Sequence, residues 1–130
     1  MMQKQINKPL LNETETTFGG LGIAPKLLDV LLRLGFKTPT SIQYKAIPAA
    51  IEGNDIIGIA QTGTGKTLAF GIPLIQQILK NGKGKGLIIL PTRELALQIS
   101  EFIQKIGRGF GIKTAVLIGG SPIGPQIKTT

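Results

Sequence analysis

The sequence predicts an α/β fold in which a parallel sheet carries helices on both faces. Three short apolar runs, residues 56–59, 87–90 and 115–118, are typical of buried parallel strands. Segments with helical spacing separate these runs, so that strand and helix alternate along the chain. A glycine-rich turn, residues 60–67, follows the first run. Ligands of such folds bind at the carboxyl ends of the strands, where this turn lies.

Composition narrows the class of protein. The chain has 130 residues, 42% hydrophobic and 17% charged, which fits one globular domain. The absence of Cys excludes a disulfide scaffold and a thiolate metal site. No apolar stretch reaches the roughly 20 residues of a membrane span, so we expect a cytoplasmic protein without a membrane partner. The net charge of +8 indicates a polyanionic partner or a solvated basic surface.

A polar arm and a first helix are expected before the strands. Residues 1–17 lack periodicity and are predicted to be a flexible N-terminal arm. Leucines then recur at helical spacing over residues 27–34, with Pro25 near the start and Gly35 past the end.

The second helix is expected over residues 41–51. Thr40 or Ser41 would cap it, and Pro48 would kink or shorten it. The first strand of the predicted sheet follows.

Two later helices alternate with the strands. The third helix is expected over residues 65–79, disturbed at Pro73. Thr92 can cap a fourth helix that lasts to about residue 106, where the glycines of residues 107–111 end it.

The turn over residues 60–67 reads Ala-Gln-Thr-Gly-Thr-Gly-Lys-Thr and ends as a phosphate-binding loop does. Gly63 and Gly65 allow the backbone to turn its N–H groups inward around a phosphate. A helix that begins at about Gly65 points its positive N-terminus at the same anion.

The last two residues of this loop carry its chemistry. Lys66 supplies a charge to the β- and γ-phosphates, and the Thr67 hydroxyl can bind Mg²⁺. One residue departs from the general pattern, which has Gly where this chain has Ala60.

Four segments in order resemble motifs of the DEAD-box RNA helicases. Residues 35–43, Gly-Phe-Lys-Thr-Pro-Thr-Ser-Ile-Gln, resemble the adenine-reading Q motif, with a lone aromatic, Phe18, upstream. Residues 60–67 are similar to motif I, in which Ala at the first position is usual. Residues 91–98, Pro-Thr-Arg-Glu-Leu-Ala-Leu-Gln, are similar to motif Ia, and Gly119-Gly120 resembles the double glycine that follows it.

The resemblance implies that residues 18–130 are part of an N-terminal RecA-like P-loop NTPase domain that binds ATP with Mg²⁺. It also implies RNA binding through the backbone, without sequence preference. The parent protein would be an ATP-dependent RNA helicase. Because nothing here resembles the Asp-Glu-Ala-Asp motif or the second domain, we expect no hydrolysis by this chain alone. The edge of a truncated sheet would favour self-association.

The resemblance also assigns the site residues. Catalytic roles fall to Lys66 and Thr67, and Thr67 is the expected metal ligand. The residues expected to bind the nucleotide are Phe18, Phe36, Lys37, Thr38, Gln43, Gln61, Thr62, Gly63, Thr64, Gly65, Lys66, Thr67 and Leu68. The residues expected to bind RNA are Pro91, Thr92, Arg93, Gly119 and Gly120.

The chemistry of the base site agrees with this assignment. The amide of Gln43 can offer one donor and one acceptor to the N6/N7 edge of adenine. Phe18 and Phe36 can offer apolar surfaces on which the base stacks. The alternative is that Gln43 is only a solvated helix residue.

The chemistry of the RNA site is open to two interpretations. Arg93, next to Thr92 at a helix N-terminus, makes an anion site suited to a nucleic-acid phosphate. The alternative is a helix cap with a surface pair between Arg93 and Glu94.

Three hypotheses of function follow. The first is the nucleotide-docking front of a DEAD-box RNA helicase, and the second is a stand-alone nucleotide- or RNA-binding module without hydrolysis. The third is a different phosphate-loop enzyme, such as a small kinase, which would have no use for the segments at residues 35–43 and 91–98.

Overall fold

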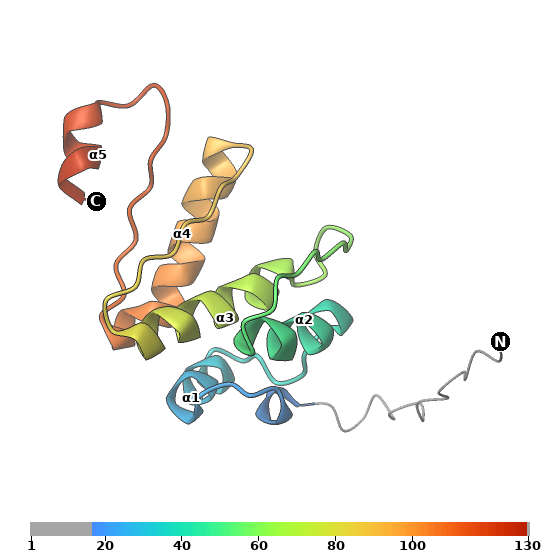
Figure 1. Ribbon diagram of the computed structural model, residues 1–130. Helices are drawn as coiled ribbons and strands as arrows, with labels where there is room; N and C mark the ends of the chain where they lie inside the picture. Colours follow the sequence, from blue (N-terminus) through green and yellow to red (C-terminus); the bar gives the residue numbers. More distant parts are fainter. Residues whose placement is uncertain (1–16, 130) are drawn as a thin grey trace.

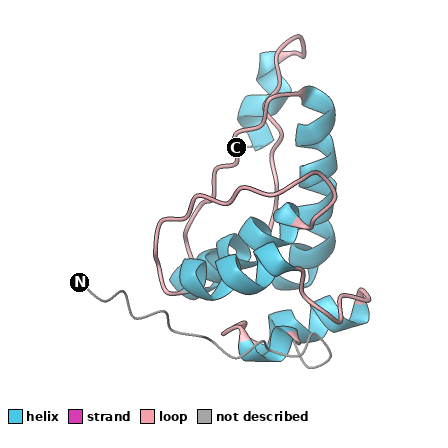
Figure 2. Cartoon of the chain, turned by 90° about the vertical axis from the view of Figure 1, so that its right-hand side faces the viewer, coloured by secondary structure: helices cyan, strands magenta, loops and turns pink. Residues whose placement is uncertain are grey.

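The computed structural model describes residues 17–129, and within them it contains helices joined by extended segments (Figures 1 and 2). The elements are η1 (Phe18–Gly20), α1 (Pro25–Arg33), α2 (Ser41–Ile51), α3 (Lys66–Asn81), α4 (Arg93–Gly107), η2 (Arg108–Phe110) and α5 (Ile123–Thr129). The predicted arm lies outside the described residues, except for Thr17, whose hydroxyl caps η1. None of the described helices is long and apolar enough to cross a membrane.

Helix α1 begins and ends at the residues that the sequence predicted. Pro25 stands at the first helical position, where its missing N–H has no partner to lose. Gly35 follows the end of the helix with a φ of 89°, a conformation that favours glycine. An exposed ion pair of 2.7 Å joins Arg33 to Asp29 one turn earlier.

The later helices also lie where they are expected, within a residue or two. Helix α2 continues through Pro48 to Ile51, so the proline does not shorten it. At the start of α4, the hydroxyl of Thr92 accepts a hydrogen bond from the N–H of Leu95 at 3.2 Å. This bond confirms Thr92 as the cap of that helix.

The core lies between the helices. Helix α2 packs on α3, α3 packs on α4, and α1 also contacts α4. The side chain of Gln76 on α3 ties in the segment before α1, because it accepts from the N–H of Ala24 at 2.8 Å and donates to the carbonyl of Gly22 at 3.0 Å. The buried side chains of the core are Phe18, Leu21, Ile23, Leu27, Leu31, Ile47, Leu68, Ile72, Ile75, Ile99, Ile103 and Ile106.

The predicted parallel sheet is wrong for residues 17–129, which form no strand. The three apolar runs are extended, but each lies on a different helix. A Cβ on Gly58 would come within 3.3 Å of Ile42 of α2, and a Cβ on Gly86 would overlap Leu74 of α3. The hydroxyl of Thr114 is hydrogen-bonded to side chains of α4. The runs therefore pair with helices and not with one another.

Side-chain exposure along the runs gives the physical reason. Ile88 and Leu90 pack against the core, whereas Leu87 and Ile89 between them are 82% and 84% exposed. This alternation is the period of a strand with one covered face. The predicted helices on both faces are therefore wrong here, since nothing in the described part covers the outer side chains. A ladder also needs a neighbouring strand at about 4.8 Å, and none of the described segments takes that place.

Candidate functional site

The expected phosphate loop, residues 60–67, joins an extended segment to the N-terminus of α3 (Figure 1). Gly63 and Gly65 have φ values of 81° and 84°, in the left-handed region that other residues rarely adopt. Gly65 is also the N-cap of α3, so the helix begins at Lys66. The glycines therefore stand where the conformation requires them.

Hydrogen bonds within the loop hold it in a closed shape. The ammonium of Lys66 donates to the carbonyl of Ala60 at 2.7 Å, across the mouth of the loop. The hydroxyl of Thr64 donates to the carbonyl of Gln61 at 2.6 Å. Lys66 is solvent-exposed, so a phosphate can reach it and replace the carbonyl as its partner.

The first turn of α3 offers backbone donors to the loop. The N–H of Ala69 makes the bond of the first helical turn, to the carbonyl of Gly65 at 3.3 Å. The N–H groups of Lys66, Thr67 and Leu68 come before that bond, as the unpaired donors of a helix N-terminus do. The side chain of Leu68 is 4% exposed and belongs to the core, so only its backbone can serve a ligand.

The structure brings Gln43 to the same loop. Its amide oxygen accepts from the N–H of Thr40 at 2.9 Å, and its amide nitrogen donates to the carbonyl of Gly65 at 3.0 Å. With 3% exposure, Gln43 is not the solvated helix residue of the alternative interpretation. One proton and one lone pair of the amide lie beyond these two bonds, and in this conformation they are covered.

The two aromatic residues differ from the expected stacking surfaces. Phe18 is 1% exposed and lies in the core, so its ring is not available to a base in this conformation. Phe36 is half-buried and stands edge-on to Phe102, with ring centroids 6.2 Å apart and planes at 72°. Lys37 and Thr38 are exposed in the turn before α2. The base site is therefore less complete than the phosphate site.

The other residues that we expect to contact the nucleotide differ in their exposure to solvent. Gln61 and Thr62 are exposed in the loop, and Thr67 is half-buried at the start of α3. Among the residues that the structure describes, no group of three His, Cys, Asp or Glu side chains could hold a metal ion. The Thr67 hydroxyl stays the metal ligand that the sequence predicts.

The predicted RNA residues converge at the N-terminus of α4. A side chain on Gly120 would meet the guanidinium of Arg93, and Gly120 itself has a φ of 76°. Pro91 and Gly119 are exposed at the same place. Over residues 17–129, the ion pair that forms is the one within α1, so Arg93 and Glu94 do not make the alternative surface pair.

Sequence reasoning missed α5 and the residue Gln126. The signals were the spacing of Ile123 and Ile127 by one turn and Pro125 in the first turn of the helix. The amide of Gln126 binds both backbone groups of Ile118, immediately before the double glycine.

The loop, its glycines and the helix after it define the class of protein: the site is that of a phosphate-loop domain. The family model of the DEAD/DEAH box helicases matches residues 40–130. The chain belongs to this family.

Solved structures of RNA helicases also match the chain, and their TM-scores confirm the predicted likeness to RecA-like helicase domains, although the described residues form no strand. The ADP-bound RNA helicase Prp28 from Chaetomium thermophilum is 38% identical with a TM-score of 0.76, over 85% of this chain and 28% of that one. A DEAD box protein from Methanococcus jannaschii is 38% identical with a TM-score of 0.74, over 87% and 31%. A variant of S. cerevisiae Dbp5 bound to RNA and ADP BeF3 is 32% identical with a TM-score of 0.66, over 72% and 25%. The chain thus spans less than a third of each relative.

Proposed function

We propose that this chain binds ATP through residues 60–67. The contact between Lys66 and the Ala60 carbonyl carries the proposal, because it places an exposed ammonium at the mouth of a loop whose glycines already have left-handed φ values. A β- or γ-phosphate would take the place of that carbonyl and receive the N–H groups of α3 as well. Thr67 would hold Mg²⁺ beside the phosphates.

The base would lie toward α2, where Gln43 meets the loop. Gln43 would give adenine its preference over guanine through the donor and acceptor left on its amide. The ADP bound to the Prp28 relative supports an adenine nucleotide. Phe36 is the available apolar surface, since Phe18 lies in the core.

RNA would bind at the residues that converge at the N-terminus of α4. The guanidinium of Arg93 at the start of α4 lies against Gly120, and the space beside Gly119 is open, so a phosphate can approach the main chain next to a positive charge. Such contacts read no bases, so binding would be independent of sequence. The net charge of +8 and the RNA bound to the Dbp5 relative support this assignment.

The whole protein would be an ATP-dependent RNA helicase, of which residues 18–130 are part of the N-terminal RecA-like domain. We propose that this chain alone binds but does not hydrolyse ATP, because its sequence contains no Asp-Glu-Ala-Asp motif to hold Mg²⁺ and the attacking water. RNA-stimulated phosphate release that is lost in Lys66→Ala would favour a complete small NTPase instead. A binding module without hydrolysis is the second candidate, and it gains support if the reading frame ends after Thr130.

Titration calorimetry with ADP and Mg²⁺ tests the nucleotide site. Loss of a charge-assisted phosphate contact weakens binding by about 1.5–3 kcal/mol, so we expect at least tenfold weaker binding by Lys66→Ala. Lys80→Ala, which removes an equal charge at the other end of α3, is the matched control and keeps the affinity of the wild type. Equal affinities of all three proteins would disprove the site.

A further inference from the structure

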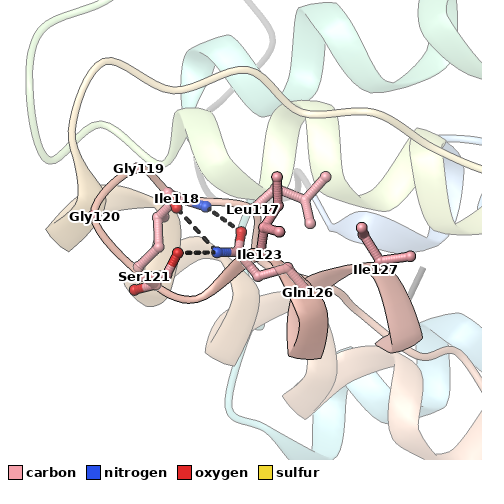
Figure 3. Close-up of a pocket in the computed structure, with 8 residues that line it drawn as sticks. All are labelled: Leu117, Ile118, Gly119, Gly120, Ser121, Ile123, Gln126 and Ile127. Carbon is pink, nitrogen blue, oxygen red and sulfur yellow. Dashed lines mark hydrogen bonds between the residues drawn. The ribbon is translucent and has the colours of Figure 1, made fainter.

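The double-glycine turn, which we define as residues 118–121, is held by a side chain that no motif contains. Gln126 on α5 points back at the turn, and its amide meets the residue before the two glycines and the residues after them (Figure 3). Polar contacts on both sides of one turn are an arrangement that fixes its shape.

The contacts on the near side imitate a neighbouring strand. The N–H of Ile118 donates to the Gln126 amide oxygen at 2.9 Å, and the amide nitrogen donates to the Ile118 carbonyl at 3.1 Å. Two residues of an antiparallel pair exchange the same two bonds. Gln126 therefore gives Ile118 the hydrogen-bond partners that a strand lacking a neighbour would not have.

The contacts on the far side close the turn. The amide nitrogen also lies 3.3 Å from the carbonyls of Ser121 and of Pro122. Gly119 and Gly120 have no side chains, and a Cβ on Gly119 would meet no atom within 4 Å. Gln126 therefore holds the residues on either side of the glycines, and the guanidinium of Arg93 lies against Gly120.

We infer that Gln126 is a positioning residue of the RNA-binding surface, an inference that rests on the proposed RNA function. It holds the main chain of Gly119 and Gly120 in the shape that meets a phosphate, and it does not touch the RNA itself. Two adjacent glycines lose more conformational freedom on ordering than any other pair, so a turn that is fixed in advance binds more tightly.

Fluorescence anisotropy with a labelled oligouridine separates this role from that of Arg93. Gln126→Met keeps the size of the side chain and removes its hydrogen bonds, so we expect about fivefold weaker binding. Because no charge is lost, the dependence of affinity on salt should keep its slope. Gln77→Met on the exposed face of α3 is the control and should behave as the wild type.

Amide hydrogen exchange measures how well the turn is ordered in the absence of any ligand. In Gln126→Met, the N–H group of Ile118, which donates to the Gln126 amide oxygen, should exchange several times faster, while those of the core helices α3 and α4 stay protected. Gln126→Asn has an amide that is one methylene too short, so its exchange rate should lie between those of the wild type and Gln126→Met. It replaces the Met variant in the experiment if that variant does not fold. ADP affinity should be unchanged in both variants, because Gln126 lies outside the phosphate loop.

The outcomes distinguish the two proposals. Unchanged exchange of the Ile118 N–H in Gln126→Met would overturn the positioning role, whether or not RNA binds. A shallower salt slope would also overturn it, since Gln126 would then act through a charged contact. Absence of RNA binding by the wild type would disprove the RNA function and leave the exchange experiment to decide the role of Gln126.

Discussion

The side-chain nitrogen of Gln43 on α2 donates a hydrogen bond to the main-chain carbonyl of Gly65 at 3.0 Å, across 22 residues of sequence. The oxygen of the same amide accepts from the N–H of Thr40 at 2.9 Å. One buried side chain thus connects the start of α2 with the start of α3. These are the two places where we propose that the base and the phosphates bind.

Replacing Gln43 by Ala should affect both stability and base preference. The change leaves the Thr40 N–H and the Gly65 carbonyl without their partner, so we expect a loss of about 1–3 kcal/mol in the free energy of unfolding. Denaturation in urea measures the loss. Gln77→Ala, in which the side chain is exposed, is the control. In competition titrations the wild type should prefer ADP to GDP, and Gln43→Ala should not. Equal competition by GDP against the wild type would contradict the role of Gln43 in reading adenine.

Replacing Gly65 by Ala should be more damaging than the same change at Gly53. Both residues have a left-handed φ, 84° and 91°, which costs an alanine about 1–2 kcal/mol. A Cβ on Gly53 would meet no atom within 4 Å, whereas a Cβ on Gly65 would overlap the amide of Gln43. The difference between the two variants in urea denaturation therefore isolates the contact with Gln43. Equal losses would show that Gln43 yields without cost.

Removing the charge of Arg93 should change how RNA affinity depends on salt. We expect Arg93→Ala to weaken binding to every sequence alike and to make the log–log slope shallower by about 0.7, the value for one phosphate of a single strand. Anisotropy at several salt concentrations measures the slope. Arg33→Ala removes an equal charge from α1, where the residue pairs with Asp29, and should leave the slope unchanged. An unchanged slope in Arg93→Ala would make Arg93 a plain surface residue.

The exposed apolar side chains of the extended segments should cause self-association. Ile57, Ile59 and Ile89 are 94%, 90% and 84% exposed, and segments of this kind are prone to pair with another chain. Sedimentation velocity should show species larger than the monomer, and Ile89→Lys should reduce them. Leu32→Lys on α1, where the side chain is 48% exposed, is the control. A wild type that is monomeric at every concentration would disprove self-association.

The sequence predicted the helices well because their signals are local. Pro25 and Gly35 mark the ends of α1, and the hydroxyl of Thr92 begins α4, without help from distant parts of the chain. The sheet could not be predicted in the same way. The apolar run at residues 87–90 has the composition of a strand, but a strand also needs a partner, and here the run lies on α3.

The candidate site, too, could be predicted from the sequence only in part. The loop at residues 60–67 is a local motif, and its glycines have the expected conformation. The burial of Phe18 in the core and the bond of Gln43 to Gly65 depend on residues far along the chain, so no spacing disclosed them. Gln126 was missed because its partners are backbone groups, which leave no mark in the sequence.

Packing between helices that follow one another in the chain has a consequence for how this protein folds. Helix α2 packs on α3, and α3 on α4, while the extended segments rest singly on those helices. Contacts between neighbours in sequence form early, since little loop-closure entropy opposes them. The helical core should therefore assemble quickly during synthesis on the ribosome. The apolar runs stay exposed on its surface. Because the isoleucines of these runs stay exposed in the finished fold, they are a natural target for chaperones.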